Sequence, residues 1–184
     1  KVTGDIKIIN NQMPEDIDNS KTYKVECKYD DEKYINEINN NQSKHILTIE
    51  DPIEFKYKPN KSIISQREIG SNTKDFAGAL RRALREAPDV ILVGEMRDKE
   101  TIEITLKAAE TGHLVFSTLH TYSAVQTIER ILSNFDGNDK KLVQNSLATV
   151  LTCIISQKLI RTNQNKLEIA YEILYNNFAV SNNI

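Results

Sequence analysis

The feature that most constrains the fold is a short apolar run that ends in a carboxylate. Residues 90–93 read Val-Ile-Leu-Val, and Gly94 and Glu95 follow directly. A fully apolar run rich in β-branched residues suits a strand buried on both faces of a parallel sheet. Ligands bind at the carboxyl ends of such strands, where a carboxylate can hold magnesium or orient a water in a nucleotide hydrolase. Glu95 is therefore expected at a ligand-binding edge, and the simpler alternative is a Glu95 that only faces solvent.

Strand-like and helix-like segments alternate around this run. Residues 46–49 and 114–116 predict two more strands, and apolar residues at helical spacing predict helices over 73–87 and 98–112. Such alternation is typical of an α/β fold with a parallel sheet and helical crossovers. The remaining expected elements are strands over 6–9 and 23–27, a weak helix near 34–38, helices over 123–132 and 143–154, and a hairpin of 156–160 and 166–175.

Composition excludes several classes of protein. A net charge of −2 on 184 residues gives no general attraction to nucleic acid. Cys27 and Cys153 form no C-x-x-C pair, so we expect free thiols in a reducing cytosol and no metal site built by the protein alone. No apolar run approaches the roughly 18 residues of a membrane span, so any membrane role is expected to be peripheral. The length suits one domain with or without a small appendage, and the start at Lys1 fits a fragment or a processed product.

Polar side chains follow three of the expected strands. Residues 50–54 hold three carboxylates in five positions, Glu95 follows the next strand, and Thr118 and His120 follow the third. The carboxyl ends of parallel strands share one edge of the sheet, so these groups are expected together. Carboxylates and an imidazole at one edge suit a phosphoryl-transfer or hydrolytic site. A solvated acidic loop and a structural histidine are the ordinary alternatives.

Four segments resemble the secretion ATPases of type II secretion and type IV pili, and within that family the pilus retraction branch: HILTIEDPIEF (45–55), ALRRALREAPDVILVGEMRD (79–98), AAETGHLVFSTLHT (108–121) and ISQKLI (155–160). The resemblance implies a RecA-like P-loop ATPase core, with residues 33–184 as an incomplete C-terminal domain. Residues 1–32 do not resemble the family and form an atypical, truncated N-terminal segment. The tetracysteine metal element usual in assembly ATPases does not occur in the sequence, which favours the retraction branch.

The resemblance also implies roles for individual residues. Glu54 activates the attacking water, Glu95 positions magnesium and water, and His120 senses the γ-phosphate. The residues implied to support nucleotide and magnesium are Glu50, Asp51, Gly94, His113 and Thr118. The candidates for an arginine finger across a subunit interface are Arg67, Arg82 and Arg97, for which a place on a solvated surface is the alternative.

By the same resemblance, the chain is a motor ATPase that uses ATP and Mg2+. The family works as a homo-hexameric ring in the cytoplasm, peripheral to the inner membrane, and moves pilin subunits through an inner-membrane platform protein. No nucleic-acid partner is implied. The resemblance leaves retraction, assembly and secretion as possible roles.

One part of a nucleotide site is absent from the sequence. A P-loop ATPase needs G-x-x-x-x-G-K-[ST], whose backbone N–H groups cradle the phosphates, yet no glycine lies between Gly4 and Gly70. Residues 23–32, where the family has this loop, are instead rich in acidic residues. Two hypotheses stay open: a truncated or rearranged motor ATPase, or a non-catalytic family member that acts as a structural subunit without binding nucleotide.

Overall fold

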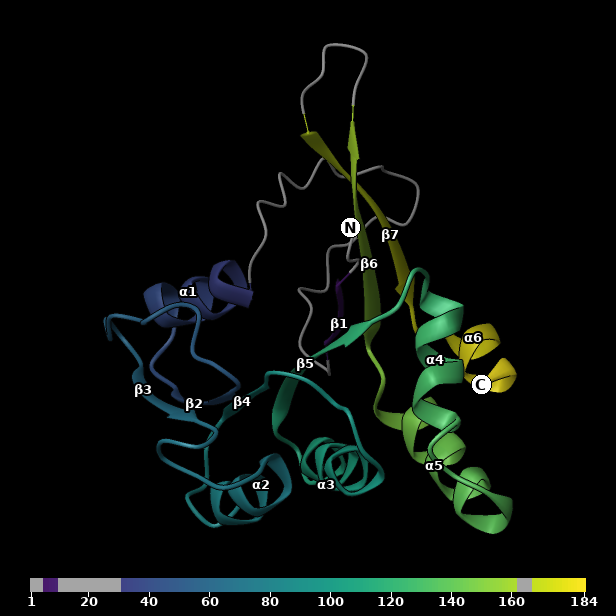
Figure 1. Ribbon diagram of the computed structural model, residues 1–184, viewed down its shortest axis with the longest axis horizontal. Helices are drawn as coiled ribbons and strands as arrows, with labels where there is room; N and C mark the ends of the chain where they lie inside the picture. The colour runs from purple at the N-terminus through teal and green to yellow at the C-terminus, as the bar shows by residue number, and fades with distance from the viewer. Residues whose placement is uncertain (1–4, 10–30, 162–166) are drawn as a thin grey trace.

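A seven-stranded sheet organises the part of the chain that the computed structural model describes, namely residues 5–9, 31–161 and 167–184 (Figure 1). The strand order is β3-β2-β4-β5-β1-β6-β7. The strands are β1 (Asp5–Ile9), β2 (His45–Glu50), β3 (Ile63–Glu68), β4 (Val90–Val93), β5 (Leu114–His120), β6 (Cys153–Arg161) and β7 (Leu167–Tyr175). The helices are α1 (Asp31–Asn41), α2 (Phe76–Ala83), α3 (Lys99–Glu110), α4 (Ala124–Leu132), α5 (Gly137–Val150) and α6 (Phe178–Asn183).

The strands β3, β2, β4 and β5 form the parallel half of the sheet. All four residues of β4 are buried, as the apolar run predicts for a strand covered on both faces. Its side chains alternate between two clusters, with Leu92 in the cluster beneath α1 and Ile91 in the cluster beneath α2 and α3. Figure 1 shows α1 on one side of these strands and α2 and α3 on the other. The predicted α/β architecture, a parallel sheet flanked by helices, is confirmed for this half.

The other half of the sheet is antiparallel: the hairpin predicted from residues 156–160 and 166–175 is confirmed, whereas the place of β1 beside it is not predicted by the sequence. Strand β1 lies between β5 and β6 and runs antiparallel to both, and β6 pairs with β7 as a hairpin. The sheet is therefore mixed, because the strand from the start of the chain enters its middle in reverse. A third apolar cluster, formed by α3, α4 and α5 against β5 and β6, covers this region.

Several boundaries differ from the predicted ones. The helix predicted over residues 73–87, with Asn72 or Thr73 as its cap, is shorter: α2 begins after Asp75, whose carboxylate accepts from the backbone N of Gly78 at 2.5 Å. Thr73 lies two residues before the observed cap, and its hydroxyl accepts a hydrogen bond from Arg82 at 2.6 Å. The apolar stripe predicted as a helix to residue 154 covers two elements, since α5 ends at Val150 and β6 begins at Cys153.

Two elements were not predicted at all. Strand β3 is an edge strand of half-buried, mostly polar residues, so it lacks the apolar signature of β2 and β4. Helix α6 has only six residues and none of them is buried. The strand predicted over residues 23–27 lies outside the described residues. Within the described part of the chain, no helix has the length and apolar character to cross a membrane.

Candidate functional site

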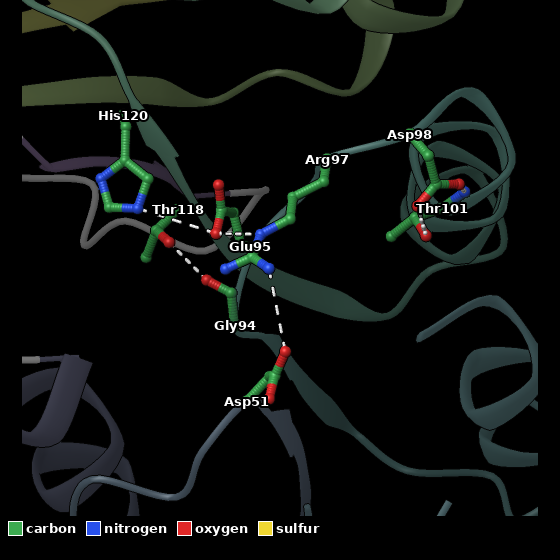
Figure 2. A network of polar contacts seen from close by, with 8 residues as sticks. All are labelled: Asp51, Gly94, Glu95, Arg97, Asp98, Thr101, Thr118 and His120. Atoms are coloured by element: carbon green, nitrogen blue, oxygen red, sulfur yellow. Dashed lines mark hydrogen bonds and ion pairs between the residues drawn. The ribbon is translucent and has the colours of Figure 1, made fainter. Parts of the chain in front are cut away.

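The carboxyl ends of β2, β4 and β5 meet at one edge of the sheet, as the pattern of strands predicts. The register pairs Ile49 of β2 with Val93 of β4, and Val93 in turn with Ser117 of β5. The segments that follow these pairs therefore lie side by side. Figure 2 shows Asp51, Gly94, Glu95, Thr118 and His120 gathered at this edge.

Arg97 connects the charged groups at the edge. Its Nε lies 2.5 Å from Oε2 of Glu95, and its Nη1 lies 3.8 Å from Oδ2 of Asp51 (Figure 2). The hydrogen bond from Arg97 to Glu95, together with the negative charge of Glu95, raises the pKa of Arg97 above its usual value. On the other side, Nε2 of His120 lies 3.7 Å from the same Glu95 oxygen. Glu95 therefore lies at the centre of this group of charged side chains, between Arg97 and His120, and its side chain is only 18% exposed.

Gly94 is needed for the close approach of β2 and β4 at this edge. Its backbone N donates to the carbonyl oxygen of Ile49 at 2.8 Å. A Cβ atom at position 94 would lie 3.1 Å from that oxygen and 3.3 Å from Cα of Glu50. Thr118 fixes the other side of Gly94, because its hydroxyl donates to the Gly94 carbonyl oxygen (Figure 2). Any larger residue would push apart the two strand ends that carry Glu50 and Glu95.

Glu54 lies in the loop over residues 51–62 that joins β2 to β3, and its side chain is exposed. Glu50, at the end of β2, accepts hydrogen bonds from Thr48 Oγ1 at 2.6 Å and from Gln66 Nε2 at 3.2 Å. Glu54 is therefore an exposed carboxylate on a loop, whereas Glu50 is tethered at the end of a strand. Glu54 is the one whose side chain is open to a ligand or a water.

His113 is not brought to this edge. It precedes β5, whereas His120 ends that strand, so about 20 Å of extended chain separates the two residues. Nδ1 of His113 lies 2.9 Å from the carbonyl oxygen of Ala108 and 3.2 Å from Thr111 Oγ1. Its contacts tie the end of α3 to the start of β5, which differs from the expected place beside the nucleotide.

The three candidate arginines lie in different places. Arg97 is at the edge, and both Arg67 and Arg82 are bound elsewhere within the chain. Nη2 of Arg67 contacts both carboxylate oxygens of Glu86, at 2.6 and 2.7 Å. Nη2 of Arg82 donates to Thr73. An arginine finger acting across an interface stays a prediction for all three.

The described residues supply groups that can act on a phosphate, and they do not supply the loop that holds one. Among them, no cluster of three or more His, Cys, Asp and Glu side chains is arranged to hold a metal ion. The strand beside β5 is β1, which reaches the edge with its amino end, since Asp5 pairs with His120. A strand that leads into a phosphate loop has to reach this edge with its carboxyl end. These residues alone therefore do not fit a complete Mg2+–ATP site.

Two residues of the site carry no local sequence signal and were not predicted. Gln66 and Glu68 of β3 both hydrogen-bond to the loop that carries Glu54. Their partners are 9 to 15 residues away in the chain. Only the fold brings them together, so no local motif could have identified them.

Comparison with known proteins gives relatives that match over most of this chain. A family model described as type II/IV secretion system protein matches residues 32–181. A twitching motility protein of Neisseria gonorrhoeae is 55% identical over 149 residues, which are 80% of this chain and 40% of that protein. The type IV pilus retraction ATPase PilT of Pseudomonas aeruginosa is 50% identical over 145 residues, which are 79% of this chain and 42% of that protein.

A solved structure agrees with these relatives. The crystal structure of the pilus retraction motor PilT with bound ADP is similar with a TM-score of 0.77 at 55% identity, over 80% of this chain and 43% of that one. The family and the retraction branch expected from the sequence are therefore confirmed. This chain spans only about two fifths of the length of the two curated relatives.

Proposed function

Because the chain belongs to the type II/IV secretion system protein family, we propose that it carries the hydrolytic edge of a motor ATPase for type IV pilus retraction. The observation that supports this most strongly is the set of contacts at the carboxyl ends of the parallel strands, where Glu95 contacts both His120 and Arg97 and Arg97 also faces Asp51. The retraction role is drawn from the names of the relatives, a twitching motility protein and a retraction ATPase.

The residues of the edge have distinct tasks in this proposal. Glu54, exposed on its loop, accepts a proton from the attacking water. In a complete site Glu95 would hold Mg2+ and orient that water, and His120 would respond to the γ-phosphate. Arg97 compensates the charge of Glu95 within one chain, and it stays with Arg67 and Arg82 as a candidate for contact with a neighbouring subunit.

The phosphates require a further element. The sequence contains no G-x-x-x-x-G-K-[ST], so the edge acts only beside a strand–loop–helix segment that supplies the backbone N–H groups for the triphosphate. We place the working motor in a hexameric ring on the cytoplasmic face of the inner membrane, against a platform protein.

A chimera tests this proposal. Residues 33–184 would replace the matching region of the gonococcal twitching motility protein, with which this chain shares 55% identity. We expect the chimera to hydrolyse ATP, and Glu54→Gln to lower kcat by about 10² to 10⁴-fold, as loss of a general base does. Glu129→Gln, an exposed carboxylate on α4, is the matched control and is expected to have no effect.

The outcomes separate the two hypotheses. Hydrolysis that persists in the Glu54→Gln chimera contradicts the assigned role of Glu54. A chimera that folds and binds ATP without hydrolysing it supports a non-catalytic subunit. For the 184-residue chain by itself, calorimetry with Mg2+–ATP is expected to give no binding, and micromolar affinity would show that the phosphate loop is dispensable.

A further inference from the structure

The loop that carries Glu54 is held by β3 on both sides of that residue. On the amino side, the backbone N of Ile53 donates to Oε2 of Glu68 at 3.0 Å. On the carboxyl side, Nε2 of Gln66 donates to the carbonyl oxygen of Phe55 at 2.9 Å, and the backbone N of Tyr57 donates to Oε1 of Gln66 at 2.9 Å. Three backbone groups within five residues are therefore fixed by two side chains of one neighbouring strand.

Gln66 also reaches the end of β2. The same Nε2 that binds Phe55 lies 3.2 Å from Oε1 of Glu50. The half-buried amide of Gln66 thus joins three parts of the chain. Its donors contact Glu50 at the end of β2 and Phe55 directly after Glu54, and its acceptor binds the backbone N of Tyr57. A glutamine side chain supplies two N–H donors and a carbonyl acceptor on one uncharged group.

Glu68 completes the arrangement as an acceptor. Its pKa is lowered, first by the hydrogen bond from the backbone N of Ile53 and then by the hydrogen bond from Ser71 Oγ at 2.8 Å. The lowered pKa means that Glu68 stays an ionised acceptor for the loop N–H to a more acidic pH than an ordinary glutamate would.

These contacts lead to an inference that rests on the proposed function, in which Glu54 activates a water. We propose that Gln66 is a positioning residue that fixes the backbone around Glu54 and so aims its exposed carboxylate. A general base must lie within hydrogen-bond reach of the proton it removes, and a catalytic group is effective when it is held within about 0.5 Å of its working position. A loop without regular structure does not reach that precision unless its backbone is fixed at neighbouring residues.

Hydrogen exchange of the whole 184-residue chain tests the inference without nucleotide. Gln66→Met keeps the bulk of the side chain and removes its hydrogen bonds. We expect protection of the Tyr57 amide to fall about tenfold, which corresponds to one net hydrogen bond, while protection of Ile91 in β4 stays unchanged. Ser65→Ala, the preceding residue on β3, is the matched control and should leave both amides as in the parent chain.

A conservative variant and a probe at position 54 separate positioning from general stabilisation. Gln66→Asn keeps an uncharged amide with the same donors and acceptor on a side chain one methylene shorter, so protection of the Tyr57 amide is expected to fall less than in Gln66→Met. A nitroxide attached at Glu54→Cys, with Cys27→Ser, should become several-fold more mobile when Gln66→Met is added. Because only the proposed function depends on hydrolysis, a result here stands whether or not the chimera is active.

The inference is overturned by either of two results. One is a Tyr57 amide that keeps its protection in Gln66→Met, and the other is an equally mobile nitroxide with and without Gln66. If Gln66→Met lowers protection across the whole sheet, the milder Gln66→Asn decides, because an equal loss of protection at all amides in that variant assigns Gln66 to general stability.

Discussion

Gly94→Ala is the substitution with the sharpest structural expectation. The new methyl carbon would lie 3.1 Å from the carbonyl oxygen of Ile49 and 3.3 Å from Cα of Glu50. Both are backbone atoms of β2, which is buried between neighbouring strands and cannot rotate away as a side chain could. The backbone of β2 must therefore shift by a few tenths of an ångström at the point where the Gly94 amide donates to Ile49.

The expected cost follows from two contributions of known size. Forcing one extra methyl group into a tightly packed site costs about 1–3 kcal/mol. Weakening the hydrogen bond between Gly94 and Ile49 adds about 0.5–1 kcal/mol. An unstrained Gly→Ala change would stabilise the fold by about 0.4–1 kcal/mol through the unfolded chain, which offsets part of the loss. We therefore expect the free energy of unfolding to fall by about 2 kcal/mol.

Urea unfolding followed by circular dichroism measures this change. The midpoint should fall with little change in the m-value, because the surface exposed on unfolding is the same. Gly78→Ala is a useful comparison, since the close atom there belongs to the flexible side chain of Asp75. Its loss is expected to stay below about 1 kcal/mol, because the gain in helix propensity offsets the disturbed cap. A Gly94→Ala chain as stable as the parent would refute the close-approach argument.

Three further changes test other parts of the structure. Asn39→Ala should lower the free energy of unfolding in urea by about 2–3 kcal/mol, because its buried amide donates to the Lys58 carbonyl oxygen and accepts from a loop amide. The backbone N of His45 lowers the pKa of Asp89, so the stability that Asp89 contributes is present above its unfolded pKa and is lost as pH falls through its folded pKa. Asp89→Asn should therefore reduce the difference in melting temperature between pH 7 and pH 3, and an unchanged difference contradicts this. Ala87 has φ of 48°, a left-handed conformation that costs alanine more than glycine. Ala87→Gly should therefore raise the free energy of unfolding by up to about 1 kcal/mol and with it the melting temperature, and a lower melting temperature would argue against strain at this residue.

Part of the fold follows directly from local sequence. Strand β4 could be predicted because a strand buried on both faces has an unbroken apolar run. Strand β3 could not, because its residues are half-buried and mostly polar at the sheet edge. The direction of β1 could not be predicted either, since it is decided by pairing with strands far along the chain and not by any residue within Asp5–Ile9.

The site divides in the same way. The groups that end strands, Glu95 and His120, were expected together because parallel strands share one edge, and the structure brings them together. His113 was expected with them, yet the length of β5 places it at the far end of that strand. Gln66 was not expected, because a hydrogen bond between a strand side chain and a distant loop has no spacing that a single sequence displays.

The central place of β1 has a consequence for the order of folding. Asp5 pairs with His120 and Ile6 pairs with Ser156, and both partners lie more than a hundred positions later in the chain. Contacts so distant along the chain make a high contact order, and closing such large loops slows folding. The parallel strands can assemble before β1 finds its position. Until then β5 and β6 each carry an unpaired edge, which is the condition under which newly made sheets associate with one another.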